Sequence, residues 1–218
     1  KDEIDGTGHF FARADFTKSK DIQNFCDETI ATFGGIDIVV NNASAIFLAG
    51  TAKTPVKRFD LMHSVNVRGT FLVTQHCLPS LLEAENPHVL NLSPPLNMES
   101  RWFAPHVAYT MSKFGMSMCV LGMAEELREQ GVAVNALWLR TVIATAAVQN
   151  LLGGDAMVQR SRKPEIMADA AYAILLRDSR ECSGNFFVDD EVLHEEGVTE
   201  LGHYSVDPEV ELSGDFFL

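Results

Sequence analysis

A tyrosine and a lysine one helical turn apart are the first residues that could take part in a chemical reaction. Tyr109 and Lys113 lie at positions i and i+4 of a helical pattern over residues 107–130, so they share one face. An ammonium beside a phenol favours the phenolate and lowers the pKa of the tyrosine from about 10. Such a tyrosine can exchange a proton with a substrate oxygen near neutral pH. The same spacing also occurs between ordinary surface neighbours, so both interpretations stay open.

Polar and small residues follow directly on three short apolar runs. In an open parallel sheet, ligands bind at the carboxyl ends of the strands. Amides and small side chains there would let a cofactor approach the backbone, and hydroxyls could bind a substrate oxygen. Polar turns are the alternative interpretation. The residues concerned are Asn41, Asn42, Ala43 and Ser44 after the run 36–40, Ser93 after 88–92, and Thr141, Ile143 and Thr145 after 132–138.

Asn66 stands inside a helical stretch that begins at Thr54-Pro55 and continues to about Glu83. Asparagine is a poor residue for a helix interior, because its side chain competes for backbone groups. We therefore expect either a local kink at this position or a side chain that holds a water molecule.

The elements that must position these residues alternate between short apolar strands and helices. This alternation is typical of a parallel sheet with helices on both faces, and it predicts a doubly wound α/β fold. The stretch 141–163 lies between a strand and a helix, and is either a mobile lid or an ordinary surface loop. The predicted strands are 9–14, 36–40, 88–92, 132–138 and 185–188, and the predicted helices are 18–33, 54–83, 107–130 and 164–176.

Composition narrows the class of protein. The 218 residues are 46% hydrophobic and 22% charged, which indicates one globular domain. A net charge of −13 argues against a nucleic-acid surface, and no apolar run reaches the length of a membrane span. The four cysteines and seven histidines show no metal-binding spacing, so we expect no metal site. Reduced, mostly buried thiols and the lack of a signal peptide favour a cytoplasmic protein.

The negative charge is concentrated near the end of the chain. Residues 181–218 contain eleven Asp or Glu residues and no Lys or Arg. A solvated acidic segment and a docking site for a basic partner are the two interpretations.

The order of these features resembles the short-chain dehydrogenase/reductase family, over essentially the whole chain. A strand precedes Asp15, a second strand precedes Asn-Asn-Ala-Ser, and Asn66 lies in a helix. Ser93 follows the next strand, and Tyr-x-x-x-Lys precedes the last motif, a strand with a threonine-containing loop. The resemblance implies a Rossmann-like fold and hydride transfer between a nicotinamide cofactor, NADP or NAD, and a carbonyl/alcohol pair.

The resemblance also assigns catalytic roles. Tyr109 would be the general acid/base, Lys113 would tune it and bind the nicotinamide ribose, and Asn66 would hold a water in a proton relay. Ser93 would bind the substrate oxygen, although it lies sixteen residues before the tyrosine where the family has about thirteen. If the strand keeps its register, the usual serine position falls on Pro94.

Cofactor contacts follow from the same resemblance. Asp15 would contact the adenine, Asn41 and Ala43 would lie along the cofactor, and Ile143 and Thr145 would line the nicotinamide side. The proline that the family usually has after the last of these strands is replaced in Trp138-Leu139-Arg140-Thr141.

The family's glycine-rich phosphate loop is not found, because Gly6-Thr7-Gly8 precedes a strand and not a helix. We therefore expect residues 1–218 to form a single dehydrogenase domain that lacks its first β-α-β portion, with 181–218 as its acidic end. The strand 9–14 would then have no neighbour, and 36–40 would be an open edge. The alternative function is a catalytically inactive binding or scaffold module of the same fold.

Partners are implied in part by the resemblance. Family members form homodimers or homotetramers through the helices that match 66–83 and 107–130. The apolar residues Met116, Met118, Val120, Leu121 and Met123 suit that use or a monomer core. The lid residues Ile143, Val148, Leu151, Leu152 and Met157 suit an apolar, lipid-derived carbonyl substrate, or simply pack the lid. The resemblance also allows a peroxisomal or mitochondrial location.

Overall fold

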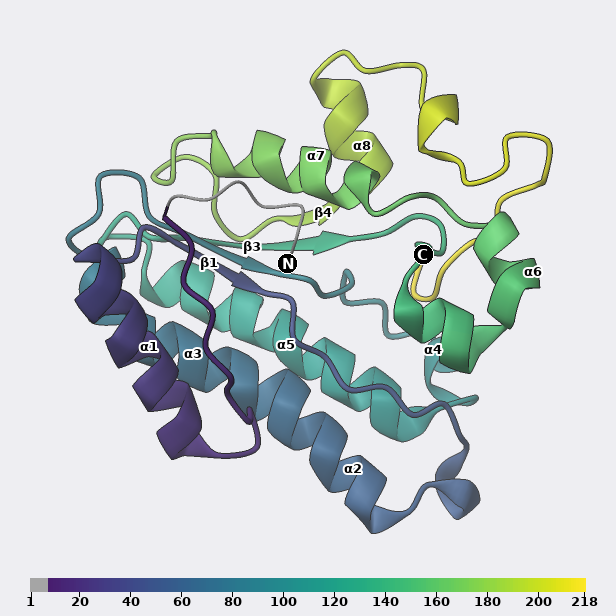
Figure 1. Ribbon diagram of the computed structural model, residues 1–218, viewed down its shortest axis with the longest axis horizontal. Coiled ribbons are helices and arrows are strands. Elements are labelled where there is room, and N and C mark those ends of the chain that lie inside the picture. Colours follow the sequence, from purple (N-terminus) through teal and green to yellow (C-terminus); the bar gives the residue numbers. More distant parts are fainter. Residues whose placement is uncertain (1–7) are drawn as a thin grey trace.

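The computed structural model describes residues 8–218 and is built on a four-stranded parallel sheet (Figure 1). The strands are β1 (Ile38–Asn41), β2 (His88–Asn91), β3 (Ala133–Trp138) and β4 (Phe186–Val188), in the spatial order β1-β2-β3-β4. Each neighbouring pair is parallel. Every residue of β2 and β3 is buried, which is the pattern expected of central strands that are covered on both faces.

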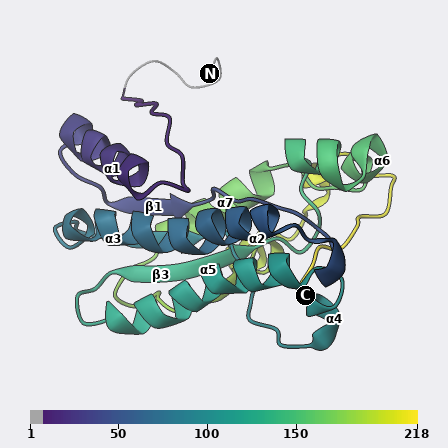
Figure 2. The same cartoon turned by 90° about the horizontal axis from the view of Figure 1, so that it is seen from below.

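Helices cover both faces of the sheet. One layer contains α1 (Ser19–Phe33), α3 (Thr70–Leu81) and α5 (Val107–Glu126), which lie side by side in Figure 2. The opposite layer contains α7 (Glu165–Leu175) and α8 (Asp189–Glu195) (Figure 1). A separate apolar core fills each side of the sheet. The predicted doubly wound α/β fold is confirmed.

Shorter elements complete the chain. The long predicted helix over 54–83 is divided into α2 (Val56–Met62), a π-helical segment η2 (His63–Gly69) and α3. The irregularity expected near Asn66 is therefore found, and α5 ends four residues before the predicted Gln130. The stretch 141–163 contains short helices and is tied to the later part of the chain by bridges from Thr141 to Gly214 and from Arg162 to Ser205. The remaining elements are η1 (Thr51–Lys53), α4 (Ser100–Phe103), η3 (Val148–Leu152), α6 (Gly154–Gln159) and η4 (Gly202–Tyr204).

The predicted strand at 9–14 is wrong. This segment is extended but carries no strand, and the sheet therefore has four strands where the sequence predicted five. A strand is stabilised by hydrogen bonds to a neighbour, and within residues 8–218 no strand runs beside this segment. Gly6 and Thr7 of the Gly6-Thr7-Gly8 sequence lie outside the described residues.

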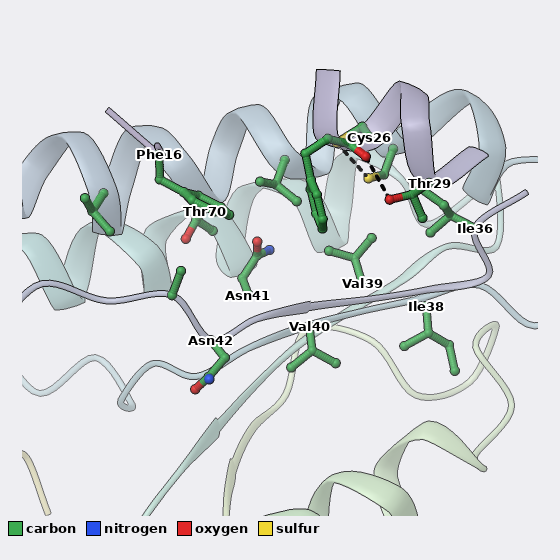
Figure 3. Close-up of a pocket in the computed structure, with 15 residues that line it drawn as sticks. Phe16, Cys26, Thr29, Ile36, Ile38, Val39, Val40, Asn41, Asn42 and Thr70 are labelled. Carbon is green, nitrogen blue, oxygen red and sulfur yellow. Dashed lines mark hydrogen bonds between the residues drawn. The ribbon is translucent and has the colours of Figure 1, made fainter. Parts of the chain in front are cut away.

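Strand β1 is an edge of the sheet, as predicted for 36–40. Figure 3 shows Val39 and Asn41 pointing toward the layer of α1 and α3, whereas Ile38 and Val40 point to the other face. Val39 and Asn41 are buried, but Ile38 and Val40 are 45% and 48% exposed. A groove of about 300 Å³ lies along this edge. Residues from α1, β1, α3 and the segments next to α1 and β1 line it, among them Phe16, Phe25, Cys26, Thr29, Ile36, Val39, Asn41, Ala43, Thr70 and Cys77.

All four cysteines are free thiols, and three of them are buried. Cys26 of α1 and Cys77 of α3 pack together with their sulfur atoms 3.6 Å apart. Within residues 8–218, no helix is both long enough and apolar enough to cross a membrane. The compartment in which the protein works stays a prediction.

A close helix contact connects η2 to α5. A Cβ atom added at Gly115 would lie 2.5 Å from Cγ2 of Val67, so only glycine fits at this position without a shift of the valine. The backbones of α5 and η2 can therefore approach closely enough for a side chain of η2 to reach α5.

This contact generates a stability prediction with a matched control. Gly115→Ala should overpack the contact with Val67, at a cost of about 1 to 3 kcal/mol. Gly122→Ala, in the same helix with no atom within 4 Å of the new Cβ, should only gain helix propensity, about 1 kcal/mol. Urea unfolding of the two variants should show the G115A midpoint well below that of G122A. Equal midpoints would show that the contact imposes no steric limit.

Candidate active site

Helix α5 places the tyrosine and the lysine in one cavity. Tyr109 and Lys113 both line a cavity of about 560 Å³, together with Leu92 after β2 and Trp138 at the end of β3. Asn42, which follows β1, completes this edge. The cavity therefore lies at the carboxyl ends of β1, β2 and β3, as predicted for a ligand site in an open α/β sheet.

The ammonium of Lys113 is fully withdrawn from solvent. Its Nζ donates a hydrogen bond of 2.7 Å to the carbonyl oxygen of Leu92 and lies 3.6 Å from Sδ of Met116. It also lies 4.9 Å from the centre of the Trp138 ring, in a cation–π contact. Burial lowers the pKa of Lys113 to about 7, and the negative charge of Asp215 partly opposes this shift. Lys113 therefore exchanges its proton near neutral pH.

Tyr109 departs from the sequence prediction. Burial raises the pKa of its phenol above the usual value, and the charge of Asp215 raises it further. The expected lowering by the neighbouring ammonium is wrong in this structure, because desolvation of the phenolate is the larger effect. Burial thus favours the protonated form of the phenol.

Asn66 connects the loop after β1 to α5. Its Oδ1 accepts a hydrogen bond from the backbone N–H of Ala45 at 2.7 Å. Its Nδ2 donates to the carbonyl oxygen of Ala45 at 3.0 Å and to Oγ of Ser112 at 3.0 Å. The carboxamide thus fixes one wall of the cavity against the helix that carries Tyr109 and Lys113. The water that Asn66 would hold in a proton relay stays a prediction.

The amide of Asn41 is part of a buried network. It donates to Oδ1 of Asn91 at 2.8 Å and to Oγ1 of Thr74 at 3.3 Å, and so connects β1 to β2 and α3. Asn41 and Ala43 border the groove of Figure 3, whereas Asn42 borders both that groove and the cavity.

Besides Asn66, two predicted site residues lie outside both the cavity and the groove. Asp15 is exposed and accepts hydrogen bonds from the backbone N–H and the hydroxyl of Thr17, which lower the pKa of its carboxyl. It therefore orders the turn before α1. Ser93 is fully buried, and its hydroxyl has no hydrogen-bond partner among the described residues. Of the predicted site residues, Tyr109, Lys113, Ile143 and Thr145 line the cavity, Asn41 and Ala43 line the groove, and Asp15, Asn66 and Ser93 line neither.

The C-terminal segment Ser213–Leu218, here called the strap, returns to the cavity, which the sequence did not predict. The C-terminal end lies beside α4 in both views (Figures 1 and 2). Ser213, Gly214, Asp215 and Phe216 line the cavity, and Phe217 is buried beneath them. The only local signal was the apolar triplet Phe216-Phe217-Leu218 within an acidic segment.

The expectation of a solvated acidic segment is wrong for several carboxylates. Asp189 is fully buried and accepts a hydrogen bond of 2.9 Å from the backbone N–H of Arg140. Asp190 forms an ion pair of 2.8 Å with Arg140 and a longer one of 3.8 Å with Arg162. The basic partners of these acids therefore come from the chain itself. They fix the loop after β3 at the position where the family's usual proline is replaced.

The fold and the paired Tyr109 and Lys113 define a class of enzymes. The model of the short chain dehydrogenase family matches residues 1–153, and the chain belongs to that family. Among curated proteins, it is 52% identical to hydroxysteroid dehydrogenase-like protein 2 of Danio rerio over 94% of this chain and 48% of that protein. It is 48% identical to the protein of the same name from Homo sapiens, with the same coverage. The chain thus spans about half the length of these relatives.

Solved structures agree with this assignment. A Xanthomonas campestris protein described as a dehydrogenase superposes with a TM-score of 0.90 and 52% identity, over 94% of this chain and 74% of that one. A short chain dehydrogenase of Mycobacterium thermoresistibile gives a TM-score of 0.88 and 49% identity, over 94% and 72%. A metagenomic short-chain oxidoreductase in complex with NADP shares the fold, with a TM-score of 0.63 and 22% identity over 80% and 71%.

The hydrogen bonds of Asn66 generate a prediction for stability. Asn66→Ala would leave the backbone N–H and carbonyl of Ala45 without these partners. The loss of each buried partner costs about 1 to 3 kcal/mol, so the free energy of unfolding should fall by at least about 2 kcal/mol. Thermal unfolding checks this, with the exposed Asn42→Ala as control. Equal stability of both variants would contradict the clamping role of Asn66.

Proposed function

We propose that the protein is an NAD(P)-dependent oxidoreductase that interconverts a carbonyl and an alcohol, with Tyr109 as general acid/base. The observation that carries this proposal is the position of Tyr109 and Lys113 on successive turns of α5, both bordering the cavity at the strand ends. Family membership supports the reaction class.

The residues of the chain supply the proton and its control. In the direction of carbonyl reduction, the hydroxyl of Tyr109 donates its proton to the substrate oxygen, and the charge of Lys113 stabilises the phenolate that remains. A nicotinamide cofactor, when bound, supplies the hydride. Because the pKa of Lys113 is about 7, its charge is lost as the pH rises through that value. We therefore expect reduction to weaken above neutral pH.

The cavity fits the nicotinamide end of such a cofactor. Its volume of about 560 Å³ lies within the usual range for small-molecule sites, about 300 to 1,000 Å³. Thr145 and Lys113 would hold the amide and the ribose of the cofactor. The proposed cofactor is NADP or NAD; a neighbour of the same fold was solved with NADP.

The wall of the cavity favours an apolar substrate. Apolar side chains from the loop after β1, from the stretch 141–163 and from α7 face it, and few charged groups accompany them. A small carbonyl or alcohol with a hydrocarbon body, such as one derived from a lipid, would be desolvated there at little cost. The apolar residues are Ile46, Leu48, Leu139, Val142, Ile143, Val148, Leu152, Met157 and Met167.

We further propose that residues upstream of this sequence complete the domain. Within residues 8–218, no strand is followed by a glycine-rich turn into a helix, which is the usual site for a pyrophosphate. The open edge of β1, with the half-exposed Ile38 and Val40, is suited to pairing with a further parallel strand (Figure 3). The Xanthomonas campestris structure has about a quarter of its length outside the match, which supports this proposal.

Self-association is proposed through α3 and α5. Met118 and Leu121 of α5 and Phe71 of α3 are about half exposed, whereas Met116 and Val120 are fully buried in the core. An exposed apolar face of this kind would suit a homodimer or homotetramer.

Replacement of the proposed acid tests the function. In the full-length protein, Tyr109→Phe should lower kcat for reduction of apolar ketones or aldehydes by at least about 100-fold, because the proton donor is lost. Binding of NADPH, followed by its fluorescence, should change little. If Y109F retains turnover, Tyr109 is not the acid. If the wild-type protein reduces no carbonyl in a broad panel, the inactive binding module becomes the better description.

Cofactor binding with and without the upstream segment tests its proposed role. The full-length protein should bind NADPH, and a fragment of residues 1–218 should bind it at least about 100-fold more weakly. The physical reason is the loss of the charge-assisted hydrogen bonds to the pyrophosphate. Fluorescence titration measures both affinities, and circular dichroism checks that the fragment is folded. Equally tight binding by a folded fragment would contradict the proposed division of the cofactor site.

A further inference from the structure

We propose that Asp215 is a positioning residue of the active site, held in the cavity by the C-terminal strap so that its carboxylate keeps Tyr109 and Lys113 protonated. The proposal rests on the proposed function, because the protonated pair is the form from which carbonyl reduction starts. It assigns a role to a residue that no family motif in the sequence marks.

The strap is anchored at both sides of Asp215. The backbone N–H of Val142 donates to the carbonyl oxygen of Ser213 at 3.0 Å, and the N–H of Asp215 donates to that of Arg140 at 3.1 Å. On the other side, Nε1 of Trp138 donates to the carbonyl oxygen of Phe216 at 2.9 Å. Three hydrogen bonds to β3 and the loop after it therefore fix where the carboxylate lies.

Phe217 gives the strap its deepest contact. It is 1% exposed, and its ring centre lies between 5.2 and 6.4 Å from those of five aromatic side chains outside the strap. Its φ of 79° is in the left-handed region, which a bulky residue rarely adopts. Such a conformation persists only where the surrounding contacts determine it. The five rings belong to Trp102, His106, Tyr109, Phe114 and Trp138.

The carboxyl of Asp215 shares the cavity with both members of the pair. Asp215, Tyr109 and Lys113 all line it. Among the described residues, no carboxylate forms an ion pair with Nζ of Lys113, whose direct contacts are a carbonyl, a sulfur and an indole ring. Asp215 therefore supplies the negative charge in a site where burial disfavours the ammonium.

One carboxylate affects the protonation of both members of the pair. The carboxylate of Asp215 raises the pKa values of Lys113 and of Tyr109. Burial raises the pKa of Asp215 itself to about 6, Lys113 lowers it, and Asp189 of α8 raises it. Burial lowers the pKa of His106, whose ring contacts Tyr109. Near pH 7 the carboxylate is ionised and favours the proton on both partners.

The test measures the proton on Lys113 directly. The full-length protein is labelled with [6-¹³C]lysine, and the Lys113 signal is assigned by its loss in Lys113→Met. Its NMR titration is compared in wild type, Asp215→Asn and Asp215→Glu. In D215N the apparent pKa of Lys113 should fall by about one unit, a tenfold loss of the protonated form, as expected when an opposite charge is removed nearby. D215E should titrate close to wild type, because it keeps the charge.

The pH profile of activity provides the second readout. In D215N, the pH above which kcat for carbonyl reduction declines should fall by the same interval, with little change in KM. An unchanged Lys113 titration in folded D215N would overturn the proposal. Equal defects in D215N and D215E would also overturn it, since they would indicate a packing role.

Failure of the proposed function can be told apart from failure of this inference. The NMR titration needs no turnover. A downward shift in D215N without reduction of any carbonyl would support the placement of Asp215 and reject the proposed function.

Discussion

The burial of one ammonium group organises the active site. Removing a lysine from water is costly unless hydrogen bonds and opposite charge replace its hydration. Lys113 obtains these from three separate parts of the chain: the carbonyl of Leu92 after β2, the Trp138 ring on β3, and the field of Asp215 in the strap. Segments that border the cavity therefore also compensate for the cost of burying the lysine. The balance leaves its pKa near neutrality, where a proton can be exchanged.

Contacts between the elements of the fold position the two loops that border this site. Gly115 lets α5 approach η2, which allows Asn66 to reach both Ser112 of α5 and the backbone of Ala45. The loop after β1 is thereby fixed over the helix that carries the tyrosine and the lysine. On the other side, the ion pairs of Arg140 with Asp190 and its neighbour Glu191 hold the loop after β3 against α8. The same contacts thus pack the fold and shape the candidate active site.

The sequence predicts the parts of this molecule that depend on local pattern. The helix predicted over 107–130 is found as α5, and the spacing of Tyr109 and Lys113 on it correctly places both on one face. The segment 9–14 has the local pattern of a strand, but a strand also needs a neighbour, which local pattern does not report. The acidity of 181–218 could not show that Asp189 and Asp190 meet Arg140, about fifty residues away. The raised pKa of Tyr109 depends on burial, which the spacing alone does not determine.

We place the transfer of a hydride and a proton to a carbonyl in the cavity beside Tyr109 and Lys113. The most direct measurement incubates the full-length protein with an apolar ketone and reduced nicotinamide cofactor deuterated at C4, using each of its two stereoisomers. Mass spectrometry then locates the label in the product. The account predicts that one stereoisomer alone delivers a single deuterium to the carbinol carbon, and that Y109F delivers almost none. Cofactor binding without deuterium transfer to any carbonyl tested would contradict it.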